Sequence, residues 1–87
     1  MAHYRITLKA SAARELDDLP TQKLRRQVVA RIRALAEDPR PPGCEKLAGR
    51  DAHYRVRQGV YRIVYRIEDV ELIVEVIALG HRRDVYR

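Results

Sequence analysis

The sequence predicts an α+β fold in which a helix hairpin packs on one face of a mostly antiparallel four-stranded sheet. Apolar residues alternate near the N-terminus, recur at helical spacing between residues 24 and 35, and form three strand-like runs after residue 52. The predicted order of elements is therefore β-α-α-β-β-β. With 87 residues, the chain is expected to form one domain spanning residues 1–87.

The N-terminal part predicts a strand followed by two helices. His3–Leu8 alternates between apolar and polar residues, as a half-buried strand does. Ser11 is a candidate N-cap for a short helix that runs to about Leu19. Pro20 suits the first position of a second helix, because its missing N–H is not needed there.

The second helix has one apolar stripe and one charged face. Its apolar residues are spaced four, four and three apart, at Leu24, Val28, Ile32 and Leu35. Arg26 and Arg33 fall on the opposite, solvent side. The pair Asp38-Pro39 predicts the end of this helix, because the residue before a proline is disfavoured in helical geometry.

The C-terminal half predicts a loop and three strands. Arg40–Ala52 is rich in proline and glycine and is typical of a loop. Strands are expected at about His53–Arg57, Val60–Ile67 and Leu72–Leu79, and Gln58-Gly59 is interpreted as the tight turn between the first two. Leu72–Leu79 is apolar on both faces apart from Glu75, which predicts a central strand.

The charge balance is basic and depends mainly on arginine. The chain has 18 Lys and Arg against 12 Asp and Glu, a net charge of +6, and only three of the basic residues are lysines. Arginine presents a planar fork of donors that fits phosphate oxygens. This composition favours nucleic acid, an acidic protein, or both as partners, although most single arginines are expected to be simply solvated.

Cysteine content and hydropathy predict a cytoplasmic protein. Cys44 is the only cysteine, which excludes an internal disulfide and a cysteine-based metal site. The N-terminus has no apolar signal segment. The longest apolar runs, Leu72–Val74 and Val76–Leu79, are far shorter than a membrane span, so no membrane association is expected.

The predicted hairpin gathers arginines on one face of the sheet. If Gln58 and Gly59 form the turn, Arg55 lies directly opposite Arg62, and Arg57 and Arg66 share their face. Like charges opposite each other destabilise a hairpin, and a bound anion relieves the repulsion. The alternative is that these arginines splay into water, and a turn one residue longer moves Arg55 and Arg57 to the other face.

The C-terminal motif Gly80–Tyr86 adds a histidine, two arginines and a tyrosine. A neutral His81 can accept a proton near pH 7, and neighbouring arginines lower the pKa of a tyrosine such as Tyr86. In the structural alternative, Tyr86 packs at the sheet edge and His81 caps a turn. The chain has no clustered carboxylates, zinc motif or phosphate-binding glycine loop, so neither a metal nor a cofactor is expected.

Taken together, these segments resemble the RelE-type toxins of the RelE/ParE superfamily, from bacterial type II toxin–antitoxin systems. The resemblance covers nearly the whole chain. Its motifs are Lys46–Gly49 (KLAG), Tyr54–Arg57 (YRVR), Tyr61–Tyr65 (YRIVY) and Gly80–Tyr86 (GHRRDVY).

The resemblance implies a ribosome-dependent endoribonuclease that cuts mRNA without a metal. By position in the motifs, the implied catalytic residues are Arg62, Arg82, Tyr86 and His81. The implied RNA- and phosphate-binding residues are Arg55, Arg57, Arg83 and Lys46. Ala48 departs from the pattern, because many members have an arginine there, and one phosphate contact is therefore missing.

The resemblance also implies partners and leaves alternatives open. The implied partners are the ribosome with its mRNA and a cognate antitoxin, which forms a hetero-oligomeric complex with the toxin. One alternative is a ParE-like DNA gyrase inhibitor, which shares the fold but generally lacks the full set of basic residues and tyrosine. Another is a domain that only binds RNA or the antitoxin and does not catalyse.

Overall fold

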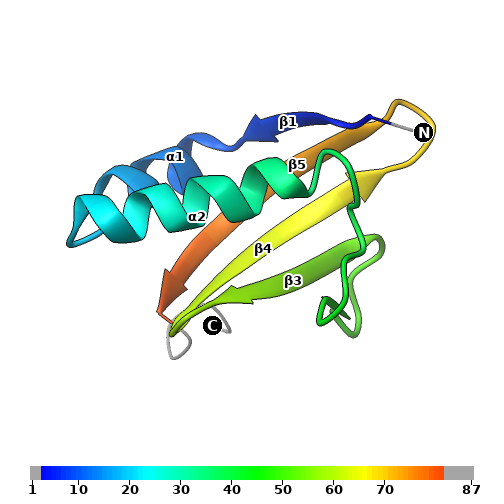
Figure 1. Ribbon diagram of the computed structural model, residues 1–87. Helices are drawn as coiled ribbons and strands as arrows, with labels where there is room; N and C mark the ends of the chain where they lie inside the picture. The colour runs from blue at the N-terminus through cyan, green and yellow to red at the C-terminus, as the bar shows by residue number, and fades with distance from the viewer. Residues whose placement is uncertain (1–2, 82–87) are drawn as a thin grey trace.

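The protein is a two-layer α+β domain in a computed structural model that describes residues 3–81 (Figure 1). Its elements are β1 (Arg5–Leu8), α1 (Ala10–Asp17), α2 (Gln22–Ala34), β2 (Glu45–Lys46), β3 (His53–Gln58), β4 (Tyr61–Glu68) and β5 (Ile73–His81). The sheet order is β1-β5-β4-β3-β2. Only β1 and β5 pair in parallel, and both helices lie on one face. The predicted fold class is confirmed.

The sheet has five strands, one more than the four that the sequence predicts. The additional strand is Glu45–Lys46, which pairs antiparallel with β3 inside the segment that we expected to be a loop. Two residues are too few to show the alternation by which a strand is recognised.

No helix within residues 3–81 combines the length and apolarity needed to cross a membrane.

The caps of both helices differ from the sequence prediction. α1 begins at Ala10, with Lys9 at its N-cap position and Ser11 already inside the helix. α2 begins after Thr21, whose Oγ1 accepts a hydrogen bond from the Leu24 amide at 3.1 Å. Pro20 therefore precedes the cap and is not the first helical residue. The threonine hydroxyl satisfies an N–H at the helix end that would otherwise lack a partner, which explains its use as the cap.

The apolar stripe of α2 is confirmed. Val28, Ile32 and Leu35 are buried, whereas Arg26 and Arg33 are exposed. The helix itself ends at Ala34, before the predicted boundary at Asp38. The chain continues in a turn, in which the Ala34 carbonyl accepts hydrogen bonds from the amides of Glu37 and Asp38.

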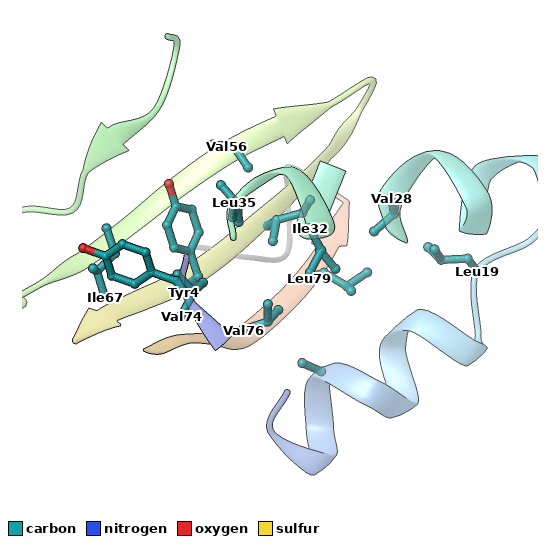
Figure 2. Close-up of a cluster of buried hydrophobic side chains, with 13 residues drawn as sticks. Tyr4, Leu19, Val28, Ile32, Leu35, Val56, Ile67, Val74, Val76 and Leu79 are labelled. Carbon is teal, nitrogen blue, oxygen red and sulfur yellow. The ribbon is translucent and has the colours of Figure 1, made fainter. Parts of the chain in front are cut away.

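The core lies between the helices and the sheet (Figure 2). Tyr65, on the central strand β4, is the largest fully buried side chain. Its hydroxyl donates to the Pro39 carbonyl at 2.8 Å, and its ring stacks on Tyr54 with 6.1 Å between centroids. Burial raises the pKa of the Tyr65 hydroxyl above its ordinary value. The core therefore also fixes the start of the loop that follows α2.

The register of the β3–β4 hairpin differs from the predicted one by two residues. Arg57, and not Arg55, lies opposite Arg62, because the turn residues are Gly59 and Val60. Gly59 has a φ of +63°, and glycine in the first position of a two-residue turn adopts this conformation without steric cost. A shift of two residues preserves the alternation of side chains. The predicted assignment of the arginines to one face is thus confirmed.

Removing the Tyr65 hydroxyl should destabilise the fold. Tyr65→Phe leaves the buried Pro39 carbonyl without its hydrogen bond, which typically costs about 1–3 kcal/mol in the free energy of unfolding. Tyr61→Phe is the matched control, because the Tyr61 hydroxyl makes no hydrogen bond within residues 3–81. Urea unfolding at pH 7 measures both variants. Equal stability of the two variants would contradict the role of this bond.

Candidate functional site

The candidate site is the face of the sheet that neither helix covers. Strand alternation places Val56 and Ile63 under the helices, where both are fully buried. The residues that alternate with them along β3 and β4 point to the opposite side. On β3 and β4 this open face carries His53, Arg55, Arg57, Arg62, Val64 and Arg66.

Two of the open-face arginines have acidic partners. Arg55 binds Glu45 of β2 at 2.6 Å, and only 17% of the Arg55 side chain is exposed. Arg66 contacts Glu75 at 3.4 Å and Glu68 at 3.3 Å. These ion pairs hold both guanidinium groups in place and compensate much of their charge.

Arg57 and Arg62 form the directly opposed pair of the open face. They lie on neighbouring strands, with Arg57 exposed and Arg62 half-buried. No acidic side chain within residues 3–81 forms an ion pair with Arg57. On its other side Arg62 lies opposite Gly80 of β5, which has no side chain to cover it. An anion between the two guanidinium groups relieves their repulsion and accepts charge-assisted hydrogen bonds.

Two predicted site residues lie elsewhere. His81 pairs with Tyr61, and the rings meet edge to face at 6.1 Å and 74°. Tyr61 packs against the core, so the register places His81 on the helix side of the sheet. Lys46 pairs with Tyr54 and faces the same side. The structure therefore does not bring His81 or Lys46 onto the face of Arg57 and Arg62.

The remaining predicted residues, Arg82, Arg83 and Tyr86, lie outside the described residues. Their roles stay predictions. The end of β5 directly precedes them in the sequence, and both of its edges make contacts. β4 pairs with it along one edge, and Glu15 of α1 accepts a bond from the Leu79 amide at 3.2 Å along the other.

Sequence reasoning missed Glu45 and Glu15 as supporting residues. Glu45 lies in a segment without periodicity, and Glu15 lies 64 positions from its partner. Glu75 could have been recognised from the sequence, because a single acidic residue in an apolar strand indicates a cation close to it.

Among residues 3–81, no three His, Cys, Asp or Glu side chains are grouped as metal ligands would be.

A network around Arg40 fixes the loop that supplies Glu45. Arg40 donates two hydrogen bonds to Asp69, at 3.2 and 2.9 Å, and one to the Tyr54 hydroxyl at 3.2 Å. Tyr4 donates to the same carboxylate at 2.7 Å. The Arg40 guanidinium, helped by the Tyr4 hydroxyl, lowers the pKa of Asp69. The network joins the loop to Tyr4, the residue before β1, to β3 and to the β4–β5 turn.

Comparison with known proteins gives a consistent match along the chain. The profile of the family described as "ParE toxin of type II toxin-antitoxin system, parDE" matches residues 6–86. The chain is also similar to toxin RelG of Mycobacterium tuberculosis, with 32% identity over 87 residues and 97% of each sequence covered.

Solved structures of toxin–antitoxin complexes contain similar chains. A chain of the complex RelBE2 from Mycobacterium tuberculosis has 29% identity and a TM-score of 0.81, with 97% of each chain covered. A chain of the intact E. coli RelBE complex has 28% identity and a TM-score of 0.78, covering 90% of this chain and 95% of that one.

The Arg40 network should make stability depend on pH in the acid range. The pKa of Asp69 is lower in the folded protein than its ordinary value of about 3.9. Its contribution to stability is therefore complete above that ordinary value and is lost as pH falls through the folded-state pKa. Asp69→Asn should be less stable than the unmodified protein at pH 7, and the difference should shrink below about pH 4. Chemical unfolding across pH 2–7 measures this, and a constant difference contradicts it.

Proposed function

Because the chain belongs to the ParE toxin family of type II toxin–antitoxin systems, within the RelE/ParE superfamily, we propose that this toxin is a ribosome-dependent endoribonuclease that cuts mRNA. The observation that carries the proposal is the opposed pair Arg57 and Arg62 on a face that neither α1 nor α2 covers. Two directly opposed guanidinium groups suit the two non-bridging oxygens of a phosphodiester.

The proposed reaction is an attack within the RNA strand. The ribose 2′-oxygen forms a bond to the adjacent phosphorus, and the bond from phosphorus to the 5′-oxygen breaks. The products are a 2′,3′-cyclic phosphate and a 5′-hydroxyl. Arg57 and Arg62 stabilise the negative charge that grows on the phosphate in the transition state. Arg55, held by Glu45, adds positive charge beside them.

Proton transfer is assigned to the C-terminal motif. Tyr86 takes the proton of the 2′-hydroxyl, Arg82 neutralises or protonates the leaving oxygen, and Arg83 contacts a phosphate. The pairing of His81 with Tyr61 favours Tyr86 over His81 as the base, because it turns the histidine toward the helix side of the sheet. Guanidinium groups supply the positive charge in this mechanism, and it includes no metal.

A second candidate is inhibition of DNA gyrase without RNA cleavage. The matched family profile has the ParE name, and acidic partners compensate Arg55 and Arg66, which leaves fewer arginines for a phosphate.

Two assays separate the candidates: mRNA cleavage on translating ribosomes, and supercoiling by gyrase. Cleavage of ribosome-bound mRNA supports the nuclease. Inhibited supercoiling with intact mRNA supports the gyrase inhibitor. Ribosome or RNA binding without either activity supports the non-catalytic alternative.

We further propose that a cognate antitoxin binds the helix side of the molecule in the cytoplasm. Similar toxins are known from complexes with RelB antitoxins. In this chain β1, α1 and α2 form an apolar groove, lined by Ile6, Leu8, Leu16, Val29, Ile32 and Arg33. An antitoxin segment with apolar and acidic side chains fits these residues and the net charge of +6.

Removing Arg62 should abolish most activity without unfolding the protein. Arg62 lies on the open face, so Arg62→Ala removes a phosphate contact and also one of two opposed charges. The loss of one such donor typically reduces the rate by about 10²–10³. Single-turnover cleavage on pre-bound ribosomes measures the effect, with Arg14→Ala on α1 as control. A variant that melts normally and cleaves at the unmodified rate would refute the assignment.

The base is identified by comparing two substitutions. Tyr86→Phe removes only the phenolic oxygen and should slow single-turnover cleavage strongly while ribosome binding is kept. His81→Gln should have a smaller effect, because the register of His81 places it on the other face. A larger loss in His81→Gln reverses the two roles. Full activity in both variants excludes this proton-transfer scheme.

A further inference from the structure

The helix α2 carries a second basic surface, separate from the arginines of the sheet. In 13 residues it has five cations and no acid: Lys23, Arg25, Arg26, Arg31 and Arg33. Lys23, Arg26 and Arg33 are exposed, and their spacing of three and seven places them in one stripe opposite the buried Val28 and Ile32. Ten residues of helix extend over about 15 Å. We refer to Lys23, Arg26 and Arg33 as the α2 stripe.

The cations at the start of α2 do not favour helix stability. The N-terminal end of a helix carries partial positive charge, so acids stabilise it and cations destabilise it. α2 has no acid in its first turn, and instead has Lys23 and Arg25 there. Arg31 and Arg33 lie in the last turn, where cations stabilise a helix, so helix stability explains these two residues but not Lys23 and Arg25.

The charges are also left uncompensated. Within residues 3–81, none of the five cations of α2 forms an ion pair. Arg25 donates only to a neutral group, the Asp17 carbonyl, at 3.1 Å. Arg55 and Arg66 on the sheet, by contrast, have carboxylate partners. The α2 stripe is therefore available to an external anion.

Apart from Arg33, which borders the apolar groove, the α2 stripe has surroundings that favour a phosphate backbone over a protein partner. Protein interfaces depend on apolar or aromatic anchors at their centre. The large exposed apolar residues of residues 3–81 are Leu8, Val60, Val70 and Leu72, and none belongs to α2. Gln27, Ala30 and Ala34 are exposed and small or polar, and the half-buried Val29 lies beside Arg26 and Arg33. Such a surface binds a charged backbone through donors alone.

The α2 stripe and the candidate site lie on opposite sides of the sheet (Figure 1). An RNA strand bound to α2 is therefore not the strand held by Arg57 and Arg62. We propose that the α2 stripe binds the phosphate backbone of ribosomal RNA while the open face of the sheet holds the mRNA. This inference rests on the proposed function, because it assigns the second surface to the same ribosomal target.

The test measures ribosome binding as a function of salt. All proteins carry Arg62→Ala, so that binding is observed while cleavage is about 10²–10³ slower. The test variant adds Lys23→Gln and Arg26→Gln, and the control adds Lys9→Gln and Arg14→Gln, which remove the same net charge from exposed positions outside α2. Each lost phosphate contact should reduce the slope of log K against log salt by about 0.7–0.9. We expect a reduction of about 1.5 in the test variant, with affinity about tenfold weaker, and no change in the control.

Three results would overturn the inference. The first is an unchanged slope and affinity in the test variant while the Arg62→Ala parent binds ribosomes, which leaves the proposed function intact. The second is weaker binding of the cognate antitoxin with unchanged ribosome binding, which assigns the α2 stripe to a protein. The third is a parent that does not bind ribosomes at all, together with an unmodified protein that does not cleave mRNA. That result removes the proposed function as well, and is thereby distinguished from the first.

Discussion

The alternation of side chains in the β3–β4 hairpin determines where everything else in this protein lies. The helices α1 and α2 cover the same face of the sheet, and Val56 and Ile63 fill the core on that face. The same alternation forces Arg57 and Arg62 to the other side. A slip of one residue would bury the two arginines and expose the two apolar side chains, so the register is strongly specified. The hydrophobic core thereby fixes the basic face, although no core residue touches a phosphate.

The charges on the open face are distributed unevenly, and this gives the face its chemistry. Carboxylates restrain Arg55 and Arg66. Arg57 and Arg62 are directly opposed on neighbouring strands, where like charges repel each other. The restraint on Arg55 comes from Glu45, whose strand β2 belongs to a long loop. The Arg40 network ties the start of that loop to three other segments. The orientation of an arginine beside the candidate site thus depends on contacts made at the far end of the sheet.

The sequence predicted the fold class and the two faces of the sheet, but not the register or the supporting residues. Gly59 can occupy either position of a two-residue turn, and the choice moves the pairing by two residues without changing the faces. This is why Arg62 was assigned to the correct face with the wrong partner. Membership of a motif does not encode the direction of a side chain. The sequence therefore could not predict that Lys46 and His81 lie on the helix side of the sheet. Glu15 acts on a residue 64 positions away, and no local pattern reports such a contact.

The molecule has three surfaces, the apolar groove, the α2 stripe and the open face of the sheet. Their arrangement suggests how a partner in the groove can keep the open face from its target without touching it. The apolar groove between β1, α1 and α2 is lined in part by Arg33, which also belongs to the α2 stripe. A partner that buries apolar side chains in the groove therefore extends along the stripe with any acidic residues on its flank. On the proposed assignments, such a partner displaces ribosomal RNA from α2 without contacting Arg57 or Arg62. The competition between the two partners then depends on apolar burial in the groove and on phosphate contacts along the α2 stripe. Apolar burial persists at high salt, whereas binding of the RNA backbone weakens, so rising salt shifts the toxin from the ribosome to its antitoxin.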